Sequence, residues 1–301
     1  MITTAVTPTI EMDFFSDFSA HAHAYLTAGG YQISASEAPE QICMKYFNVH
    51  KRRISVRPRK VLVSKDLQCP LDVRPGLNEI VRRAEAGEDL CPYQSKEILL
   101  DPEYNDQLLN HWGIHHLHLG LASHKKHKNL VKRTGLLLLA RVTEDTLYCI
   151  NILGHGSWTQ QKLLEIVHRN WPASIAHLRW DNAIGEQLSD RDIEILRSKN
   201  CNVALAMIDG VSYLPLGNGS SSSGTSVDVV SACARIRSTC RRMEDLIRKQ
   251  LPTQLKEEQQ GMQSRYQFKL QITDNQILAI DPQAGVSIKF GSSTDLGFEM
   301  R

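Results

Sequence analysis

The chain has 301 residues, of which 42% are hydrophobic, so it can build one large globular domain or two ordinary ones. Its net charge is +2, and no apolar run approaches the roughly 20 residues that a membrane helix needs. The N-terminal stretch MITTAVTPTIEMDFF lacks the basic start and apolar core of a secretion signal, and the seven cysteines never form a CxxC pair. We therefore expect a cytoplasmic protein with no membrane partner, and with reduced cysteines that form neither a disulfide framework nor a thiolate zinc site.

The first third of the sequence favours helices with one strand between them. Apolar spacing predicts a helix near residues 12–28 and a second helix within residues 36–50, after a serine and proline entrance. The alternating stretch at residues 56–64 predicts a strand. A further short helix is expected near residues 77–86, where a glycine follows as the stop.

Cations are concentrated between residues 45 and 65, where KYFNVHKRRISVRPRKVLVSK holds eight Lys or Arg residues and no carboxylate. Aromatic side chains lie among them, so a phosphate backbone would find both charges and stacking surfaces there. An alternative is a strand edge that charge protects from aggregation, and both interpretations stay open. The nucleic-acid-binding candidates in this segment are Lys51, Arg52, Arg53, Arg57, Arg59 and Lys60.

The clearest pattern lies in the middle third, around NHWGIHHLHLG at residues 110–120. This stretch holds four histidines within eight residues, and its part GIHHLHLG predicts a strand that carries three of them. The run RTGLLLLARVTEDTLYCINILGH then predicts a hairpin, and Thr159 is expected to cap the helix that follows. Between them lies the basic loop SHKKHK, whose candidates for nucleic-acid binding are Lys125, Lys126 and Lys128.

The last third begins with a short helix at residues 190–199 and a hairpin that turns at the Asp-Gly pair of residues 209–210. The tract GNGSSSSGTS at residues 217–226 indicates a flexible loop, and a long helix is expected over about residues 227–250. Three short strands follow. We therefore predict an α+β fold with a central mixed or antiparallel sheet, a helical N-terminal region and a smaller C-terminal α+β unit. The expected segments are residues 1–107, 108–188 and 189–301.

Alternation along the histidine strand places His116 and His118 on one face and His115 on the other. One hypothesis is a metal site, in which His116, His118 and His155 supply three nitrogen ligands and leave a fourth position open. No Asp or Glu stands close by in sequence to complete such a site. The plainest alternative is that these imidazoles pack and form hydrogen bonds inside the core.

A third hypothesis is RNA cleavage without a metal. That reaction needs a base for the 2′-hydroxyl proton, an acid for the leaving 5′-oxygen, and cations for the charge on phosphorus. Histidine serves either proton transfer near neutral pH, and arginine binds phosphate at two points. The histidines, together with Arg133 at the start of the hairpin and Arg141 near its turn, provide all of these groups.

Residues 108–171 resemble the RelE/ParE type of bacterial toxins, which share a fold with barnase, EndoU and colicin nucleases. The resemblance is carried by HHLHLG, the basic loop, the arginine-initiated hairpin and its terminal histidine. The resemblance implies a ribonuclease that needs no cofactor, in which Arg133 and Arg141 bind the phosphate of the substrate. It also implies His155 as a general acid or base, and His116 or His118 as the second proton-transfer group. The stretch PYQSKEILLDPEYNDQLLNHWGIHHLHLG also resembles a bacterial family carried on mobile or defence elements.

We therefore expect a metal-independent endoribonuclease that acts as a toxin or an anti-phage effector. RNA is the expected substrate, and an antitoxin, another protein or a second copy of the chain are the candidate partners. A different class of function is a non-catalytic component that binds nucleic acid or protein within a defence or toxin-antitoxin complex. A histidine-liganded metal hydrolase is the third alternative.

Overall fold

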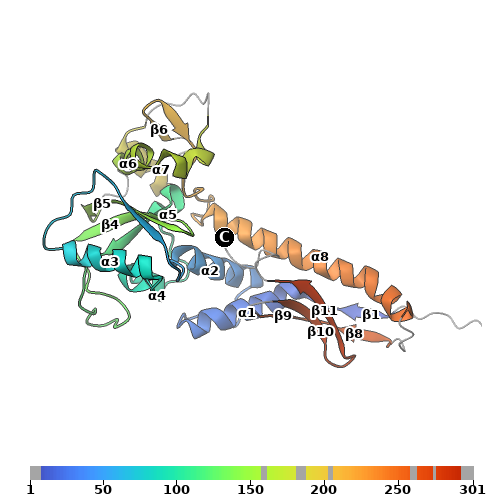
Figure 1. The fold of residues 1–301 in the computed structure, drawn as a ribbon. Helices are drawn as coiled ribbons and strands as arrows, with labels where there is room; N and C mark the ends of the chain where they lie inside the picture. Colours follow the sequence, from blue (N-terminus) through green and yellow to red (C-terminus); the bar gives the residue numbers. More distant parts are fainter. Residues whose placement is uncertain are drawn as a thin grey trace, which may run out of the picture. The chain divides into compact units, whose positions relative to one another are not determined.

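The chain forms an α+β protein, as predicted (Figure 1). It divides into two compact units, one made of residues 1–50 and 229–301 and the other of residues 51–228. Within the described residues, no helix is both long and apolar enough to cross a membrane. Thr159, the expected helix cap, lies outside the described residues. The structure is a computed structural model, and it describes residues 8–156, 161–180, 188–202, 206–257, 263–273 and 276–292.

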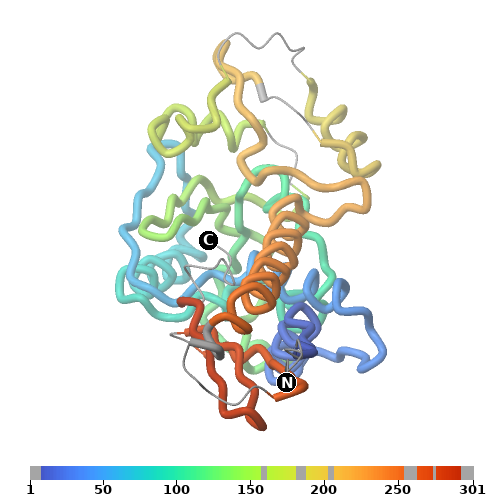
Figure 2. The backbone as a smooth tube through the Cα atoms, turned by 90° about the vertical axis from the view of Figure 1, so that its right-hand side faces the viewer, coloured from blue at the N-terminus to red at the C-terminus, as the bar shows by residue number. Residues whose placement is uncertain are grey.

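The first unit joins the two ends of the sequence. Two helices precede the middle of the chain and one long helix follows it, and Figure 2 traces this long helix, α8, as one continuous rod. A parallel pair of strands, β1 with β8, and an antiparallel sheet in the order β11-β10-β9 complete the unit. The elements are α1 (Phe14–Ala28), α2 (Pro39–Arg52), α8 (Val227–Glu257), β1 (Thr9–Glu11), β8 (Arg265–Gln267), β9 (Lys269–Ile272), β10 (Ile277–Asp281) and β11 (Val286–Gly291).

Aromatic side chains from both ends of the sequence form the core of this unit. Phe14 of α1, Phe47 of α2 and Phe268, which precedes β9, are each fully buried. Neither end can therefore bury its apolar face without the other. This is why the two compact units differ from the expected segments 1–107, 108–188 and 189–301. The C-terminal unit that we predicted takes two of its helices from the N-terminus.

The second unit is built on a four-stranded mixed sheet in the order β2-β5-β4-β3. The pair β2–β5 is parallel, and the other two pairs are antiparallel. β3, which carries the histidines, is therefore an edge strand of this sheet. The strands are β2 (Lys60–Val63), β3 (Ile114–His118), β4 (Leu136–Val142), β5 (Thr146–Gly154), β6 (Ala206–Ile208) and β7 (Val211–Tyr213), of which the last two form a separate hairpin. The helices are α3 (Arg74–Ala86), α4 (Glu97–Leu100), α5 (Gln107–Trp112), α6 (Lys162–Asn170) and α7 (Asp190–Ser198), with short 3₁₀ turns at Cys91–Tyr93 and Pro172–Leu178.

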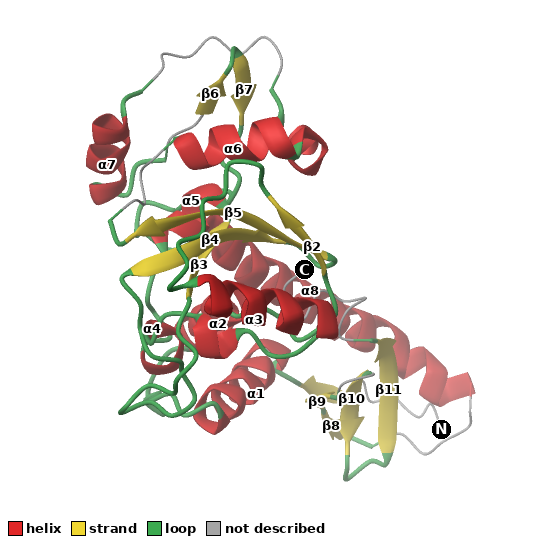
Figure 3. Ribbon diagram, turned by 60° about the vertical axis from the view of Figure 1, so that its left-hand side comes forward, coloured by secondary structure: helices red, strands yellow, loops and turns green. Residues whose placement is uncertain are grey.

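Each face of this sheet carries its own apolar core, because the residues of β3 alternate between them. Leu117 lies in the core that includes Ile80 of α3. Ile114 lies in the other core, with Leu163 of α6. Figure 3 shows α3 on one side of the sheet and α6 on the other. The face of β3 that carries Ile114 is the one that also carries His116 and His118.

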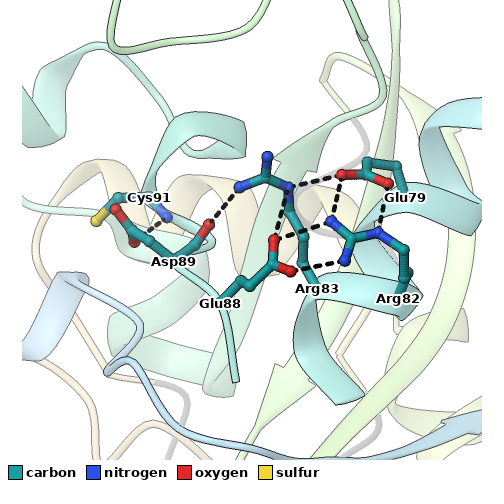
Figure 4. A network of polar contacts seen from close by, with 6 residues as sticks. All are labelled: Glu79, Arg82, Arg83, Glu88, Asp89 and Cys91. Carbon is teal, nitrogen blue, oxygen red and sulfur yellow. Dashed lines mark hydrogen bonds and ion pairs between the residues drawn. The ribbon is translucent and has the colours of Figure 1, made fainter. Parts of the chain in front are cut away.

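The end of α3 is held by a network of exposed ion pairs (Figure 4). Arg82 donates to both Glu79 and Glu88, and Arg83 donates to Glu79. These two guanidinium groups lower the pKa of Glu79 to about 2. Exposed ion pairs contribute little to stability, so the network mainly fixes the loop that leaves α3. Gly87 begins that loop with a φ of 72°, a conformation that favours glycine.

Three local predictions differ from the structure. The strand expected at residues 56–64 is limited to β2, because the backbone before it turns to place the N–H of Arg59 on the carbonyl of Ala84. The tract at residues 217–226, predicted to be a flexible loop, is folded instead. Asn202 exchanges two hydrogen bonds of 2.7 Å with the backbone of Ser220 in this tract. The C-terminal region also has four strands, β8 to β11, rather than three.

Candidate active site

His118 and His155 meet at one level of the sheet. The register pairs His118 with Leu137, and Leu137 in turn pairs with Leu153, two residues before His155. β5 ends at Gly154, and His155 follows in the turn, where its ring centroid lies 5.9 Å from that of His118. The strand alternation and the hairpin read from the sequence are sufficient to predict this pair.

His118 is the buried member, with only 2% of its surface exposed. The N–H of Thr134 donates to its Nδ1 at 3.3 Å, so the neutral ring carries its proton on Nε2. Burial, followed by the positive charge of Arg133, lowers the pKa of His118 to about 4. The ring is therefore neutral at pH 7. Its Nε2 is buried, with almost no exposed surface, and has no hydrogen-bond partner among the described residues.

His155 and Arg133 are exposed beside this buried donor. Desolvation lowers the pKa of His155, and the positive charges of Arg133 and His116 lower it further. Because the same guanidinium acts on His118 and His155, Arg133 lies within electrostatic range of both rings. An anion that binds at these exposed residues would meet the permanent positive charge of Arg133 and the imidazole of His155.

Asp106 joins the cluster through His116, although the sequence showed no carboxylate close by. Its Oδ2 lies 3.5 Å from Nδ1 of His116, and both side chains are largely buried. The six residues of α5 rise about 9 Å, and the three residues from Gly113 to His116 return about 10 Å along β3. Gly113 makes the reversal possible, with a φ of 64°. The helix and the strand therefore run in opposite directions over similar lengths, and this places Asp106 beside His116 although ten residues separate them in the sequence.

A small cavity adjoins this pair. It has a volume of about 20 Å³, enough for one water molecule, and Tyr104, Asp106, His115 and His116 contribute to its lining. Arg52 also lines it, with its guanidinium 5.8 Å from the centre of the Tyr104 ring. Its NH2 group donates to the carbonyl of Asp101 at 2.7 Å. The cavity therefore has a fixed wall, and Arg52 is part of the fold rather than a free cation.

Arg141 does not join the cluster. It pairs with Ile114 and Tyr148, at the turn end of the hairpin, and its guanidinium lies 5.7 Å from the centre of the Tyr148 ring. Four strand residues separate this level from that of His118, which is about 13 Å. The role implied for Arg141, phosphate binding beside the histidines, therefore does not fit the geometry, whereas Arg133 lies within electrostatic range of His118 and His155.

The basic segment at residues 45–65 is largely used inside the fold. Lys51 donates to Asp228 and Ser226, each at 2.6 Å. Arg59 is buried and donates to the carbonyls of Thr143 and Ser55. Since buried cations cannot meet a phosphate backbone, the prediction of nucleic-acid binding is wrong for three of the six candidates, namely Lys51, Arg52 and Arg59. Of the others, Arg53 is half-buried, Arg57 is exposed but lies 3.3 Å from Glu144, and Lys60 is exposed.

The lysines of the loop between β3 and β4 are exposed, in contrast. Lys125, Lys126 and Lys128 project from a loop whose shape is set by His124, because Nδ1 of His124 accepts from two backbone N–H groups of the same loop. The loop leads directly to Arg133. The exposed cations of the loop therefore precede the exposed Arg133 in the same connection between β3 and β4.

The described residues do not provide the set of ligands that the metal hypothesis requires. Within the part of the chain that the structure describes, no group of three or more His, Cys, Asp or Glu residues could hold a metal ion. His116, His118 and His155 are neighbours, but Nδ1 of His118 already accepts from Thr134. The comparisons with known proteins add no relative, because no family model, curated protein or solved structure matches the chain.

Proposed function

We propose that this protein cleaves RNA without a metal ion, at the cluster formed by His116, His118, Arg133 and His155. The observation that carries the proposal is the close approach of His118 and His155, whose ring centroids are 5.9 Å apart, within electrostatic range of the Arg133 guanidinium. Arg133 supplies the full positive charge that a phosphodiester also requires.

His155 is the general base of this proposal. Its lowered pKa keeps the imidazole neutral at pH 7, so that it accepts the proton of the 2′-hydroxyl. The 2′-oxygen then attacks phosphorus, the bond to the 5′-oxygen breaks, and a 2′,3′-cyclic phosphate forms. His118 is unsuited to proton transfer, because its pKa of about 4 leaves it unprotonated at pH 7 and its Nδ1 is already engaged. Of the two candidates for the second proton-transfer group, His116 therefore remains.

The exposed lysines of residues 125–128 support RNA as the substrate, because an extended polyanion reaches both the loop and Arg133. Action on RNA in the cytoplasm, as a toxin or anti-phage effector with a protein antitoxin, is the cellular role that we propose. A non-catalytic RNA-binding component would use the same lysines. It would not require the proton-transfer arrangement of His116 and His155.

The test is incubation of the purified protein with end-labelled single-stranded RNA, with and without EDTA, and analysis of the fragment ends. We expect cleavage that survives EDTA and leaves cyclic phosphate. His155→Ala should lower the rate by about 10²-fold or more, because general base catalysis is worth that amount. His21→Ala removes an exposed histidine of the other unit and serves as the matched control. RNA that stays intact but bound would favour the non-catalytic alternative, and cleavage abolished by EDTA would favour a metal site.

A further inference from the structure

Asp106 uses its two carboxylate oxygens for two different purposes. Oδ1 accepts from the N–H of Leu109 at 3.0 Å, which caps α5. Oδ2 lies 3.5 Å from Nδ1 of His116 in the neighbouring strand. The side chains of Asp106 and His116 are only 15% and 12% exposed, so the contact is shielded from solvent.

A cap alone does not require a carboxylate at this position. Asn and Ser cap helices as well as Asp does, and neither carries a charge that is costly to bury. The negative charge of Asp106 acts on the groups around it, because it opposes the effect of burial on the pKa of His115 and of Lys51. His116 is the imidazole beside it, and catalytic hydrogen bonds are often long before substrate binds, so 3.5 Å is within the range expected for a functional contact.

We propose that Asp106 is a positioning residue that holds the Nδ1–H of His116, so that His116 protonates the leaving 5′-oxygen from Nε2. This inference rests on the proposed ribonuclease function and assigns the acid of that reaction. A carboxylate beside an imidazole fixes the orientation of the ring and stabilises its positive charge. His155, which lies near the positive charge of Arg133 instead, has the opposite environment and takes the role of base.

The proton balance of the step follows from these roles. His155 takes the proton from the 2′-hydroxyl as the bond from the 2′-oxygen to phosphorus forms. His116 gives its Nε2 proton to the 5′-oxygen as the bond from that oxygen to phosphorus breaks. Asp106 keeps its charge throughout and makes no bond to the substrate. Hydrolysis of the cyclic phosphate in a later step would restore both groups, because His116 would take a proton from the attacking water and His155 would give its proton to the 2′-oxygen as the bond from that oxygen to phosphorus breaks.

Two substrates separate acid catalysis from every other contribution. An RNA dinucleotide has a poor alkoxide leaving group that needs a proton, whereas uridine 3′-(4-nitrophenyl phosphate) releases a nitrophenolate that needs none. At pH 7, Asp106→Asn should lower kcat on the dinucleotide on the order of tenfold or more, as part of the 10²–10⁴-fold effect of a general acid. Its kcat on the nitrophenyl ester should stay within about twofold of wild type, because that leaving group departs unaided. His116→Ala should show the same selectivity with a larger effect, and His155→Ala should impair both substrates.

Three controls make the result decisive. Asp106→Ser keeps the cap but removes the reach to His116, so it should behave like Asp106→Asn. Asp13→Asn alters another helix-capping carboxylate, whose Oδ1 accepts from Ser16 at 3.0 Å, and should leave both rates unchanged. Nitrogen-15 NMR of wild type should show Nδ1 of His116 protonated, and this signal should change in Asp106→Asn.

The two proposals fail in different ways. Equal losses on both substrates for Asp106→Asn, or an Nδ1 of His116 that carries no proton, would overturn the role of Asp106 and leave the ribonuclease intact. Wild-type protein that cleaves neither substrate would overturn the ribonuclease function, and the acid role with it. The nitrophenyl ester cut at a normal rate by His155→Ala would instead remove the assigned base.

Discussion

The backbone N–H of Thr134 donates to Nδ1 of His118 at 3.3 Å, and this single contact decides what the central histidine can do. It leaves the ring with one buried N–H on Nε2 and no free lone pair. In the proposed mechanism His118 therefore stays neutral, and His116 and His155 transfer the protons. Histidines that are equivalent in the sequence thus become different in the fold.

Removal of the charge of Arg133 should raise the pKa of His155. The guanidinium disfavours the protonated imidazole, so its loss in Arg133→Gln allows His155 to bind a proton at higher pH. The acid limb of the pH–rate profile should move to higher pH in the same direction. An NMR titration of His155 in wild type and Arg133→Gln measures this shift. Lys132→Gln removes a neighbouring exposed charge as control, and identical titration curves for His155 in wild type and Arg133→Gln would contradict the prediction.

The exposed lysines of the β3–β4 loop should determine how RNA binding depends on salt. For a single strand, each phosphate that the protein no longer neutralises reduces the slope of log K against log salt by about 0.7. Replacement of Lys125, Lys126 and Lys128 by Gln should therefore reduce the slope by up to about 2. Fluorescence anisotropy with a labelled RNA at several salt concentrations measures it. Lys60→Gln, in β2, is the control, and an equal effect there would extend the interface beyond the loop.

The fold should lose stability as the pH falls from about 6.5 towards 4. Burial lowers the pKa of three histidines, His111, His115 and His118, to about 4 from a usual value of 6.5. The unfolded chain therefore binds more protons than the folded chain in this window, so the free energy of unfolding rises with pH across it. Urea unfolding at pH 7, 6 and 5 checks this slope. His111→Phe should make the slope shallower, and a slope unchanged by that substitution would show that His111 does not contribute.

Gly76→Ala should destabilise the second unit, although alanine favours helices. A Cβ at Gly76 would lie 1.9 Å from the carbonyl oxygen of Leu119, so α3 would have to move away from the sheet. Overpacking of this kind costs about 1–3 kcal/mol. Gly135→Ala adds the same methyl group where nothing lies within 4 Å, and it is the matched control. Thermal unfolding of both variants measures the difference, and equal Tm values would mean that α3 adapts without cost.

Much of the fold could be predicted because its signals are local. Ser189 forms a capping box with Asp192 at the start of α7, and residues 209–210 form the turn between β6 and β7. The pairing of His118 with His155 also follows from alternation and hairpin register. Contacts between distant segments carry no such signal. Nothing in the sequence indicates that Phe14 and Phe268 share a core, or that Lys51 pairs with Asp228.

Asp106 shows why part of the site could not be predicted. An aspartate before a short helix is a recognisable cap, and the structure has it in that role. Its second contact depends on the length of α5 and on the reversal at Gly113, neither of which is visible as a spacing rule. The prediction that the basic segment at residues 45–65 binds nucleic acid was partly wrong for a related reason. Charge in a sequence does not reveal whether an arginine such as Arg59 faces water or the carbonyls of its own chain.

The order in which the two units complete their cores gives the chain a direction of assembly. Residues 51–228 form a unit with all of its own strands, whereas α1 and α2 obtain their partners only after residue 228. During synthesis, the histidine-bearing unit can therefore fold while Phe14 and Phe47 are still uncovered. A ribosome that stalls late in the message would release a folded sheet with two sticky helices at its N-terminus. Transiently exposed apolar surface of this kind favours aggregation, so the last quarter of the chain protects the first fifty residues from it.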